Sequence, residues 1–186
     1  MILEIPQPAA VLLVGAAGAG KSTFASIHFP GDAIISSDAL RAGITGDAAN
    51  QAANRRVFAA VHEALEARLA AGRIAVVDAT NITAAGRRAI RIRAADAGAP
   101  VIAIVLALPA DIVLRQNGAR PGRRRVPDAV VARHLAALEG LLERGVLDTE
   151  GYAMLVTLRD PDAVRRVTVR VAERAAVDRG ARRPVS

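Results

Sequence analysis

A short apolar run followed directly by a glycine-rich turn sets the strongest limit on how this chain can fold. Residues 10–14 are Ala-Val-Leu-Leu-Val, and residues 15–22 are Gly-Ala-Ala-Gly-Ala-Gly-Lys-Ser. The run predicts a buried strand, and the residues after the turn predict a helix from about Lys21 to His28. Such a turn directs backbone N–H groups and a helix N-terminus toward one point, which favours a bound phosphate chain.

The turn has the spacing Gly-x-x-x-x-Gly-Lys-Ser, which predicts a site for ATP or another nucleoside triphosphate (NTP) as phosphate donor. We expect Lys21 to contact the β- and γ-phosphates, Ser22 to bind Mg²⁺ (or Mn²⁺), and Thr23 to lie at the α-phosphate. Lys21 is the single lysine among the 25 lysine and arginine residues. A lysine side chain is slimmer than arginine and ends in a compact charge, so we infer that the chemistry at this position requires it. The residues expected to bind the nucleotide are Gly15, Gly18, Ala19, Gly20, Lys21, Ser22 and Thr23.

Strand and helix patterns alternate along the rest of the chain, with no internal repeat and no linker. Hydrophobic residues make up 52% of the chain and aromatic residues 2%, which suits a buried parallel sheet covered by alanine-rich helices. We therefore predict one α/β domain over residues 1–174, with a doubly wound, mostly parallel five-stranded sheet, and a basic tail over 175–186. The expected strands are 10–14, 33–36, 74–77, 101–108 and 152–157. The other expected helices are 50–71, 83–97 (N-cap Thr83), 110–116 and 128–144 (N-cap Asp128). Residues 167–171 fit either a strand or a helix.

A polar segment follows the second predicted strand. Ligands of parallel α/β folds lie outside the carboxyl ends of the strands, so we expect Asp38 beside the phosphate cradle. A carboxylate there can take the proton from an attacking hydroxyl group. Arg41, one helical turn further on, is expected to hold a phosphate of the substrate. The alternative is that Asp38 only caps a short helix.

The third predicted strand ends in an acidic residue at the same edge of the sheet. Asp78 resembles a Walker-B position, and we expect it to reach Mg²⁺ through water and to lie beside the substrate. Thr80 and Asn81 follow, and we expect them to orient the substrate or Asp38. The alternative for Asp78 is an Asx turn that only ends the strand.

An arginine-rich segment at about 117–126 separates two predicted helices after the fourth strand. In a phosphotransferase such a segment can close as a lid, because arginines neutralise charge on the transferring phosphoryl group and the closed segment excludes water. We expect Arg120 and Arg123 to act in this way, with Arg120 also contacting the nucleotide. The alternative is a solvated basic loop.

The formal net charge of +7 favours phosphate-rich partners such as nucleic acid, although a general bias that places arginine on exposed surfaces would give the same total. The chain has no cysteine, no recognisable signal peptide and no apolar stretch long enough to span a membrane. We therefore expect a cytoplasmic protein without membrane contact. His28, His62 and His134 share no metal-ligand spacing and are expected to be helix-face or packing residues.

Four motifs, in this order and spacing, resemble the kinase domain of bacterial polynucleotide 5′-kinase/3′-phosphatase (Pnkp). They are Gly15 to Thr23, Ile35-Ser36-Ser37-Asp38-x-x-Arg41, Val76-Val77-Asp78-Ala79-Thr80-Asn81 and Asn117-x-x-Arg120-x-x-Arg123. The resemblance implies an adenylate-kinase-like fold and transfer of the NTP γ-phosphate to a 5′-hydroxyl end of DNA or RNA in nucleic acid repair. It implies Asp38 as general base, Arg41 on the acceptor side, and Arg120 and Arg123 on the donor phosphates.

The chain departs from the family pattern at two points. The family commonly has an arginine directly before the position of Asn117, whereas this chain has Gln116 there and Arg115 before it. The first lid arginine is therefore either displaced or absent. Family members often continue into phosphatase and end-sealing ligase domains, which 186 residues cannot encode in addition, so the chain is an excised domain or a stand-alone kinase.

Two other classes of function share the cradle. A kinase of a small-molecule hydroxyl would use the same nucleotide site and the same Asp38, and a nucleotide-binding ATPase module would need no phosphoryl acceptor. Against the second, Val76-Val77-Asp78-Ala79 lacks the Asp-Glu pair common in motor ATPases. A GTPase is disfavoured because its guanine-reading motif needs a second lysine, and a protein kinase because neither His-Arg-Asp nor Asp-Phe-Gly occurs.

Overall fold

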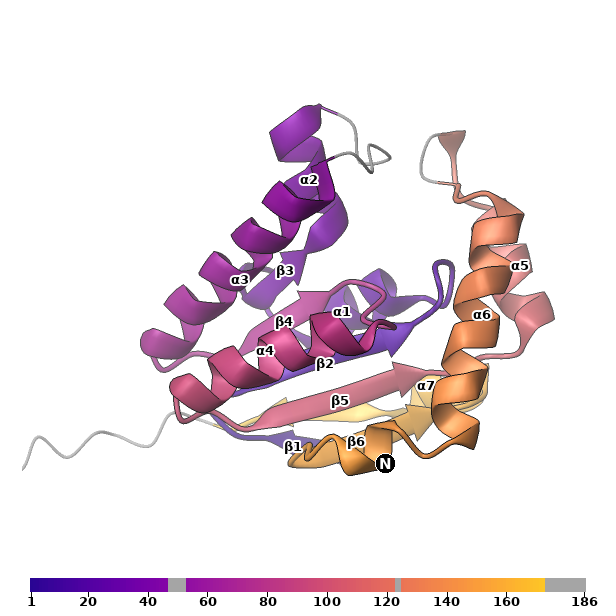
Figure 1. The fold of residues 1–186 in the computed structure, drawn as a ribbon. Coiled ribbons are helices and arrows are strands. Elements are labelled where there is room, and N and C mark those ends of the chain that lie inside the picture. Colours follow the sequence, from indigo (N-terminus) through magenta and orange to yellow (C-terminus); the bar gives the residue numbers. More distant parts are fainter. Residues whose placement is uncertain (47–52, 123–124, 173–186) are drawn as a thin grey trace, which may run out of the picture.

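A parallel β-sheet forms the centre of the protein, as a computed structural model that describes residues 1–46, 53–122 and 125–172 shows (Figure 1). Its five strands have the order β3-β4-β2-β5-β6, and every neighbouring pair is parallel. The strands are β2 (Ala10–Gly15), β3 (Ile34–Ser36), β4 (Ala75–Asp78), β5 (Val101–Leu106) and β6 (Met154–Leu158). The predicted fold class and all five predicted strands are thus confirmed.

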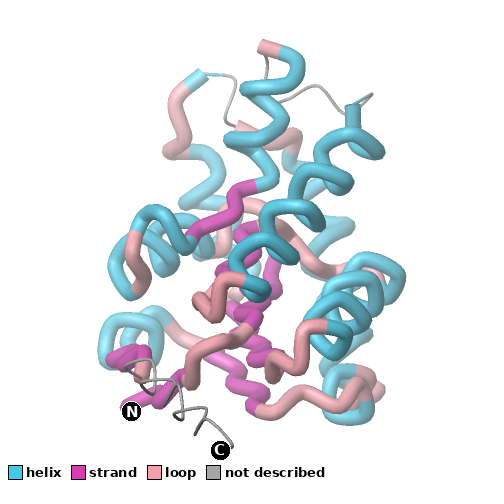
Figure 2. Tube along the Cα trace, turned by 90° about the vertical axis from the view of Figure 1, so that its left-hand side faces the viewer, coloured by secondary structure: helices cyan, strands magenta, loops and turns pink. Residues whose placement is uncertain are grey.

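Helices cover both faces of this sheet, as the view along it in Figure 2 shows. They are α1 (Lys21–His28), α2 (Ser37–Thr45), α3 (Asn54–Ala70), α4 (Ala84–Asp96), α5 (Ala110–Gly118), α6 (Asp128–Glu143) and α7 (Pro161–Arg166), with short 3₁₀ turns at Gly31–Ala33 and Leu147–Thr149. No helix within the described residues combines the length and the apolar character needed to cross a bilayer.

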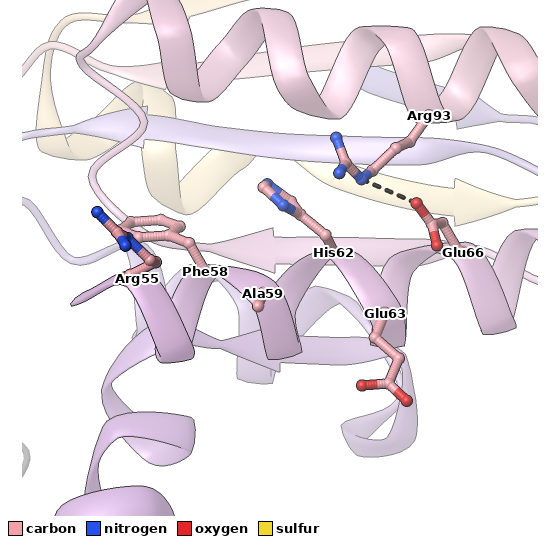
Figure 3. Close-up of a pocket in the computed structure, with 7 residues that line it drawn as sticks. All are labelled: Arg55, Phe58, Ala59, His62, Glu63, Glu66 and Arg93. Atoms are coloured by element: carbon pink, nitrogen blue, oxygen red, sulfur yellow. Dashed lines mark ion pairs between the residues drawn. The ribbon is translucent and has the colours of Figure 1, made fainter. Parts of the chain in front are cut away.

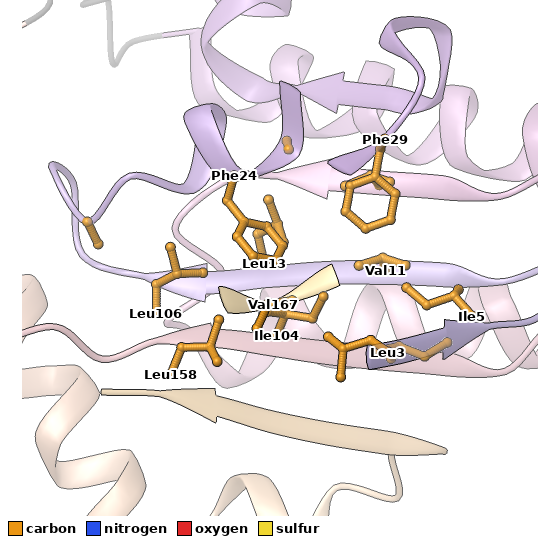
Figure 4. Packing of buried hydrophobic residues seen from close by; sticks show 14 of the residues in the cluster. Leu3, Ile5, Val11, Leu13, Phe24, Phe29, Ile104, Leu106, Leu158 and Val167 are labelled. Atoms are coloured by element: carbon orange, nitrogen blue, oxygen red, sulfur yellow. The ribbon is translucent and has the colours of Figure 1, made fainter. Parts of the chain in front are cut away.

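Alternate residues of β2 supply two separate cores. Val11 and Leu13 point to the face that carries α1, where they pack with Phe24 and Phe29 (Figure 4). Leu12 belongs to the opposite cluster, which includes buried residues of α3 and α4. Because successive side chains of a strand point to opposite faces, a run that is apolar throughout must be covered on both sides.

A second, two-stranded sheet lies beside the first. β1 (Ile2–Ile5) pairs in parallel with β7 (Thr168–Val171), so the two ends of the domain meet. Leu3 and Ile5 are buried in the cluster on the α1 face. The sequence did not predict β1 and left 167–171 undecided, because a four-residue strand has too few alternations to be distinguished by pattern alone. The basic tail predicted at 175–186 lies outside the described residues.

Helix ends agree with the sequence at some positions and differ at others. The Thr83 hydroxyl caps α4 by accepting from the Gly86 N–H at 3.3 Å, as predicted. Asp128 is instead the first residue of α6, and Pro127 holds the cap position. Helix α5 continues two residues beyond the predicted 110–116, so Asn117 belongs to a helix rather than to the loop.

The register of the sheet brings three strand ends into one line. Asp78, the last residue of β4, pairs with Leu13 of β2 and with Ser36 of β3. The phosphate cradle begins two residues after Leu13, and Asp38 follows two residues after Ser36. The segments that the sequence selected separately therefore leave the sheet side by side, at one edge.

Candidate active site

The glycine-rich turn lies between β2 and α1 and packs closely against α5. Gly18 (φ 89°) and Gly20 (φ 87°) lie in the left-handed region that glycine adopts without strain. A Cβ atom on Gly18 would come within 2.8 Å of the Val113 carbonyl oxygen and 3.0 Å of Asn117 Cβ. The turn keeps its shape because only glycine allows both this backbone angle and this close approach.

Lys21 is the first residue of α1, and its ammonium group folds over the turn. Nζ donates hydrogen bonds to the carbonyl oxygens of Gly15 (3.0 Å) and Ala16 (2.8 Å), and the side chain is buried. Burial lowers its pKa to about 8; Asp78 and Asp38 oppose this effect, and the charge of Arg120 adds to it. A phosphate in the turn would supply the counter-charge that favours the protonated lysine, so the site suits an anion.

Asp78 lies against Ser22, the residue expected to bind the metal ion. Burial raises the pKa of the Asp78 carboxyl, whereas a hydrogen bond with the Ser22 side chain and the charge of Lys21 lower it. Hydroxyl and carboxylate oxygens are hard donors of the kind that Mg²⁺ takes at nucleotide sites. Ser22 and Asp78 therefore fit the cation that the fold implies.

Asp38 lies in the first turn of α2, with its side chain exposed. The helix is capped by Ser36, whose hydroxyl accepts from the Ala39 N–H at 3.3 Å, so the alternative that Asp38 serves as the cap is wrong. The charge of Asp38 acts on both Lys21 and Asp78. The structure thus brings this carboxylate to the cradle and leaves it accessible.

Arg41 is one turn further along α2 and is buried. Its guanidinium group donates to Asn54 Oδ1 at 2.7 Å, from the first residue of α3. Helices α2 and α3 pack along each other, so the position of Arg41 is fixed from two elements. Asn54 could not be recognised from the sequence, because a polar residue at a helix start is common.

Asn81, which was expected to bind or orient substrate, makes its hydrogen bonds within the protein backbone. It has a positive φ of 50°, and its buried amide nitrogen donates to the carbonyl oxygens of Leu13 (2.9 Å), Val77 (3.2 Å) and Ala79 (3.4 Å). The Thr80 carbonyl accepts from the Gly15 N–H at 3.0 Å. Asn81 is therefore a positioning residue that holds the loop after β4 against β2 and the cradle.

Arg87 of α4 also holds this loop, and the sequence did not identify it. Its side chain is fully buried and donates to the carbonyl oxygens of Asn81 (3.2 Å) and Ile82 (2.5 Å). It also makes a bidentate ion pair with Glu150, with Nε 2.8 Å from Oε2 and Nη2 2.6 Å from Oε1. One arginine among several on a predicted helix carries no distinguishing signal; only the packing of α4 selects it.

The arginine segment is only partly described. The charge of Arg120 acts on both Lys21 and Asp78, which places Arg120 near the cradle, whereas Arg123 lies outside the described residues. The Asn117 side chain joins the two ends of the segment: its amide donates to Val126 O (2.7 Å) and Asp128 Oδ1 (3.2 Å) and accepts from Val126 N–H (3.1 Å).

The two residues before Asn117, at the end of α5, differ in their surroundings. Arg115 is 70% exposed and pairs with Asp111, its neighbour one turn back, at 3.7 Å. Gln116 faces the turn, with its Oε1 atom 3.8 Å from the point where a Cβ of Gly20 would lie. Gln116 therefore lies beside the cradle, whereas Arg115 belongs to the exposed face of α5.

A histidine that was expected only to pack also reaches the cradle. His134 of α6 is partly buried, and its Nδ1 accepts from the Ala17 N–H at 3.4 Å. Its pKa is lowered, first by burial and then by the charges of Lys21 and Arg133.

A groove of about 460 Å³ lies apart from these residues, between α3 and α4 (Figure 3). An ion pair between Arg93 and Glu66 crosses it at 2.8 Å. None of the residues predicted to bind nucleotide or substrate lines it. The residues that do are Arg55, Phe58, Ala59, His62, Glu63, Glu66 and Arg93.

Residues 11–144 match the model of the AAA domain family (AAA_33). This range contains the cradle, Asp38, Arg41, Asp78 and Arg120. No curated protein matches the sequence.

Three solved structures are similar in fold. A chain in the structure of the Pnkp1/Rnl/Hen1 RNA repair complex superposes with a TM-score of 0.65 and 23% identity, over 74% of this chain and 46% of that chain. The present protein therefore spans less than half the length of that chain. A gluconokinase from Sinorhizobium meliloti 1021 has a TM-score of 0.54 and 21% identity, over 85% of this chain and 88% of that one. Kti12 from Chaetomium thermophilum, in complex with ADP-AlF3, has a TM-score of 0.57 and 17% identity, over 84% of this chain and 93% of that one.

Proposed function

Because the chain belongs to the AAA domain family and has a P-loop kinase fold, we propose that it transfers the γ-phosphate of ATP or another NTP to the 5′-hydroxyl end of DNA or RNA. The observation that carries the proposal is the exposed carboxylate of Asp38 beside Lys21 and Asp78, with the buried guanidinium of Arg41 one helical turn away. A role in nucleic acid repair is part of this proposal.

The cradle binds the donor. N–H groups of residues 15–22 and the N-terminus of α1 hold the phosphates, Lys21 contacts the β- and γ-phosphates, and Thr23 lies at the α-phosphate. Ser22 would hold Mg²⁺ and Asp78 would contact it through water; the bound cation would neutralise charge on the phosphates.

Asp38 is the general base in this proposal. Its carboxylate accepts the proton of the attacking hydroxyl group, whose oxygen forms the new bond to the γ-phosphorus as the bond to the β-γ bridging oxygen breaks. Arg41 binds a backbone phosphate of the acceptor, and Arg120, with Arg123, stabilises charge on the transferring group. Asn81 and Arg87 act indirectly, by holding the loop that carries Asp78 next to the cradle.

Charge also supports a polynucleotide acceptor. The chain has a formal net charge of +7, and a basic surface attracts phosphate-rich polymers. The second candidate is a kinase of a small-molecule hydroxyl, which the likeness to gluconokinase favours, since that match covers most of both chains.

Transfer of labelled phosphate from ATP with Mg²⁺ tests these candidates. We expect label on a 5′-hydroxyl oligonucleotide and none on the same oligonucleotide with a 5′-phosphate. Label on gluconate alone would favour the small-molecule kinase, and phosphate release without any labelled acceptor would favour an ATPase.

Asp38→Asn tests the general base. We expect transfer to fall about 10²-fold or more with unchanged nucleotide affinity, because the amide cannot take the proton. Asp96→Asn, at the exposed end of α4, is the matched control and should keep full activity. Full transfer by Asp38→Asn would reject Asp38 as the base.

A further inference from the structure

Helix α6 brings an imidazole into the phosphate cradle. His134 Nδ1 accepts a hydrogen bond from the N–H of Ala17, which lies within the glycine-rich turn. A ring nitrogen that accepts carries no proton, so His134 is neutral here, with its proton on Nε2. The bond occupies one of the N–H groups available to a phosphate in the turn.

This bond is easily exchanged. Its length of 3.4 Å is beyond the usual range of about 2.7–3.2 Å, so it is weak. A phosphate oxygen is a stronger acceptor for a backbone N–H than a neutral imidazole, because the bond is charge-assisted. A phosphate in the cradle would therefore take the Ala17 N–H and leave His134 Nδ1 facing an anion.

The charges around His134 set the direction of its response. Among the described residues, those that act on it are Lys21 from α1 and Arg133 from its own helix, and both disfavour protonation. A triphosphate beside Lys21 brings several negative charges and reverses this balance. We propose that His134 takes up a proton when the nucleotide binds and then donates Nδ1–H to a phosphate oxygen. The proton comes from the solvent, no other covalent bond is made or broken, and the hydrogen bond from the Ala17 N–H passes from Nδ1 to the phosphate.

The position of His134 connects this event to the arginine segment. Helices α5 and α6 flank that segment, and the Asn117 side chain joins its two ends. Asn117 packs on Gly18 and His134 contacts Ala17, so both helices rest on neighbouring residues of the cradle. Protonated His134 would connect α6 to the nucleotide, and α6 begins directly after the Val126 end of the arginine segment.

The inference rests on the nucleotide-binding part of the proposed function and not on the acceptor. Calorimetric titration with a non-hydrolysable ATP analogue and Mg²⁺, in buffers of different ionisation enthalpy, measures protons taken up per nucleotide. At about pH 6.5, near the ordinary pKa of histidine, we expect wild type to take up about half a proton more than His134→Asn. Linkage then makes wild-type affinity rise about threefold more than that of the variant for each unit by which the pH falls.

The controls separate this proposal from a general effect of losing a histidine. His134→Asn keeps an acceptor, Oδ1, near the place of Nδ1 but cannot titrate. His62→Asn makes the same change in the groove between α3 and α4 and should match wild type in proton uptake. NMR titration of the wild-type histidines, of which the chain has three, gives a second measurement that needs no variant.

Equal proton uptake by wild type and His134→Asn would overturn the proposal, as would a His134 pKa that does not rise when the nucleotide binds. A wild-type protein that binds no nucleotide would reject the proposed function itself, and the inference with it. Nucleotide binding with normal proton uptake but no transfer to oligonucleotide would reject only the proposed acceptor.

Discussion

Replacing Arg87 by methionine tests whether the predicted site depends on a residue that does not touch it. The guanidinium group is fully buried and makes four hydrogen bonds, two to Glu150 and two to the carbonyl oxygens of Asn81 and Ile82. Methionine fills similar space but donates nothing. The variant leaves a mostly buried carboxylate, whose side chain is 10% exposed, without its partner.

The expected loss follows from these contacts. Removing one member of a buried ion pair typically costs about 3–5 kcal/mol, because the remaining charge stays desolvated. The Tyr152 hydroxyl also donates a hydrogen bond to Glu150, at 2.6 Å, and this bond would still stabilise part of the carboxylate charge in the variant. We therefore expect about 3 kcal/mol of lost stability, at the low end of that range.

Denaturant unfolding measures this loss as a lower midpoint with an unchanged slope. Arg88→Met is the matched control, because Arg88 is the exposed neighbour on the same helix, and we expect a change within about 0.5 kcal/mol. Transfer activity should fall in Arg87→Met at temperatures where the variant is still folded, because the loop after Asp78 loses two anchors. A loss of less than about 1 kcal/mol, or one equal to that of Arg88→Met, would refute the reasoning.

Three further outcomes are expected. Gly18→Ala should abolish nucleotide binding, because its Cβ would meet the Val113 carbonyl oxygen at 2.8 Å. Gly46 has a similar φ of 72°, and within the described residues no atom lies within 4 Å of where its Cβ would be, so Gly46→Ala measures the cost of the backbone angle, about 1–3 kcal/mol, in the same unfolding assay. Nucleotide affinity should fall as the pH rises through about 8, the pKa of Lys21, because the deprotonated amine cannot pair with phosphate. An affinity that stays constant between pH 7 and 9, measured by titrating the protein with nucleotide, would contradict this. Asn117→Ala should destabilise the protein by about 1–3 kcal/mol and speed hydrogen exchange of the Val126 amide, whereas unchanged exchange would show that Asn117 does not hold the segment.

The cradle, the strands and the polar residues at the strand ends were predictable because each depends on local pattern. A continuous apolar run is buried on both faces, and Gly18 and Gly20 adopt angles that other residues avoid. Ser36 shows the limit of this reasoning, since Ser36, Ser37 and Asp38 are all good caps by type, and only the path of the chain selects the first.

The positioning residues were not predictable, because their roles depend on contacts between distant parts of the chain. Asn81 was expected to orient the substrate or Asp38, and its contact with Leu13, 68 residues earlier, was not foreseen. Arg87 meets Glu150 across 63 residues, and His134 meets Ala17 across 117. Nothing in the local sequence distinguishes such a residue from an exposed one of the same type.

By itself, the sequence predicted a phosphate cradle and the carboxylates of Asp38 and Asp78 at the strand ends beside it. Glycine spacing, a lone lysine and strand-end carboxylates are local requirements of that chemistry. Only the tertiary structure decided how the site is held, with Asn81 and Arg87 behind it and His134 and Gln116 on the cradle. The reason is physical: burial and partner choice arise when α4, α5 and α6 pack against the sheet, and packing is a property of the whole fold.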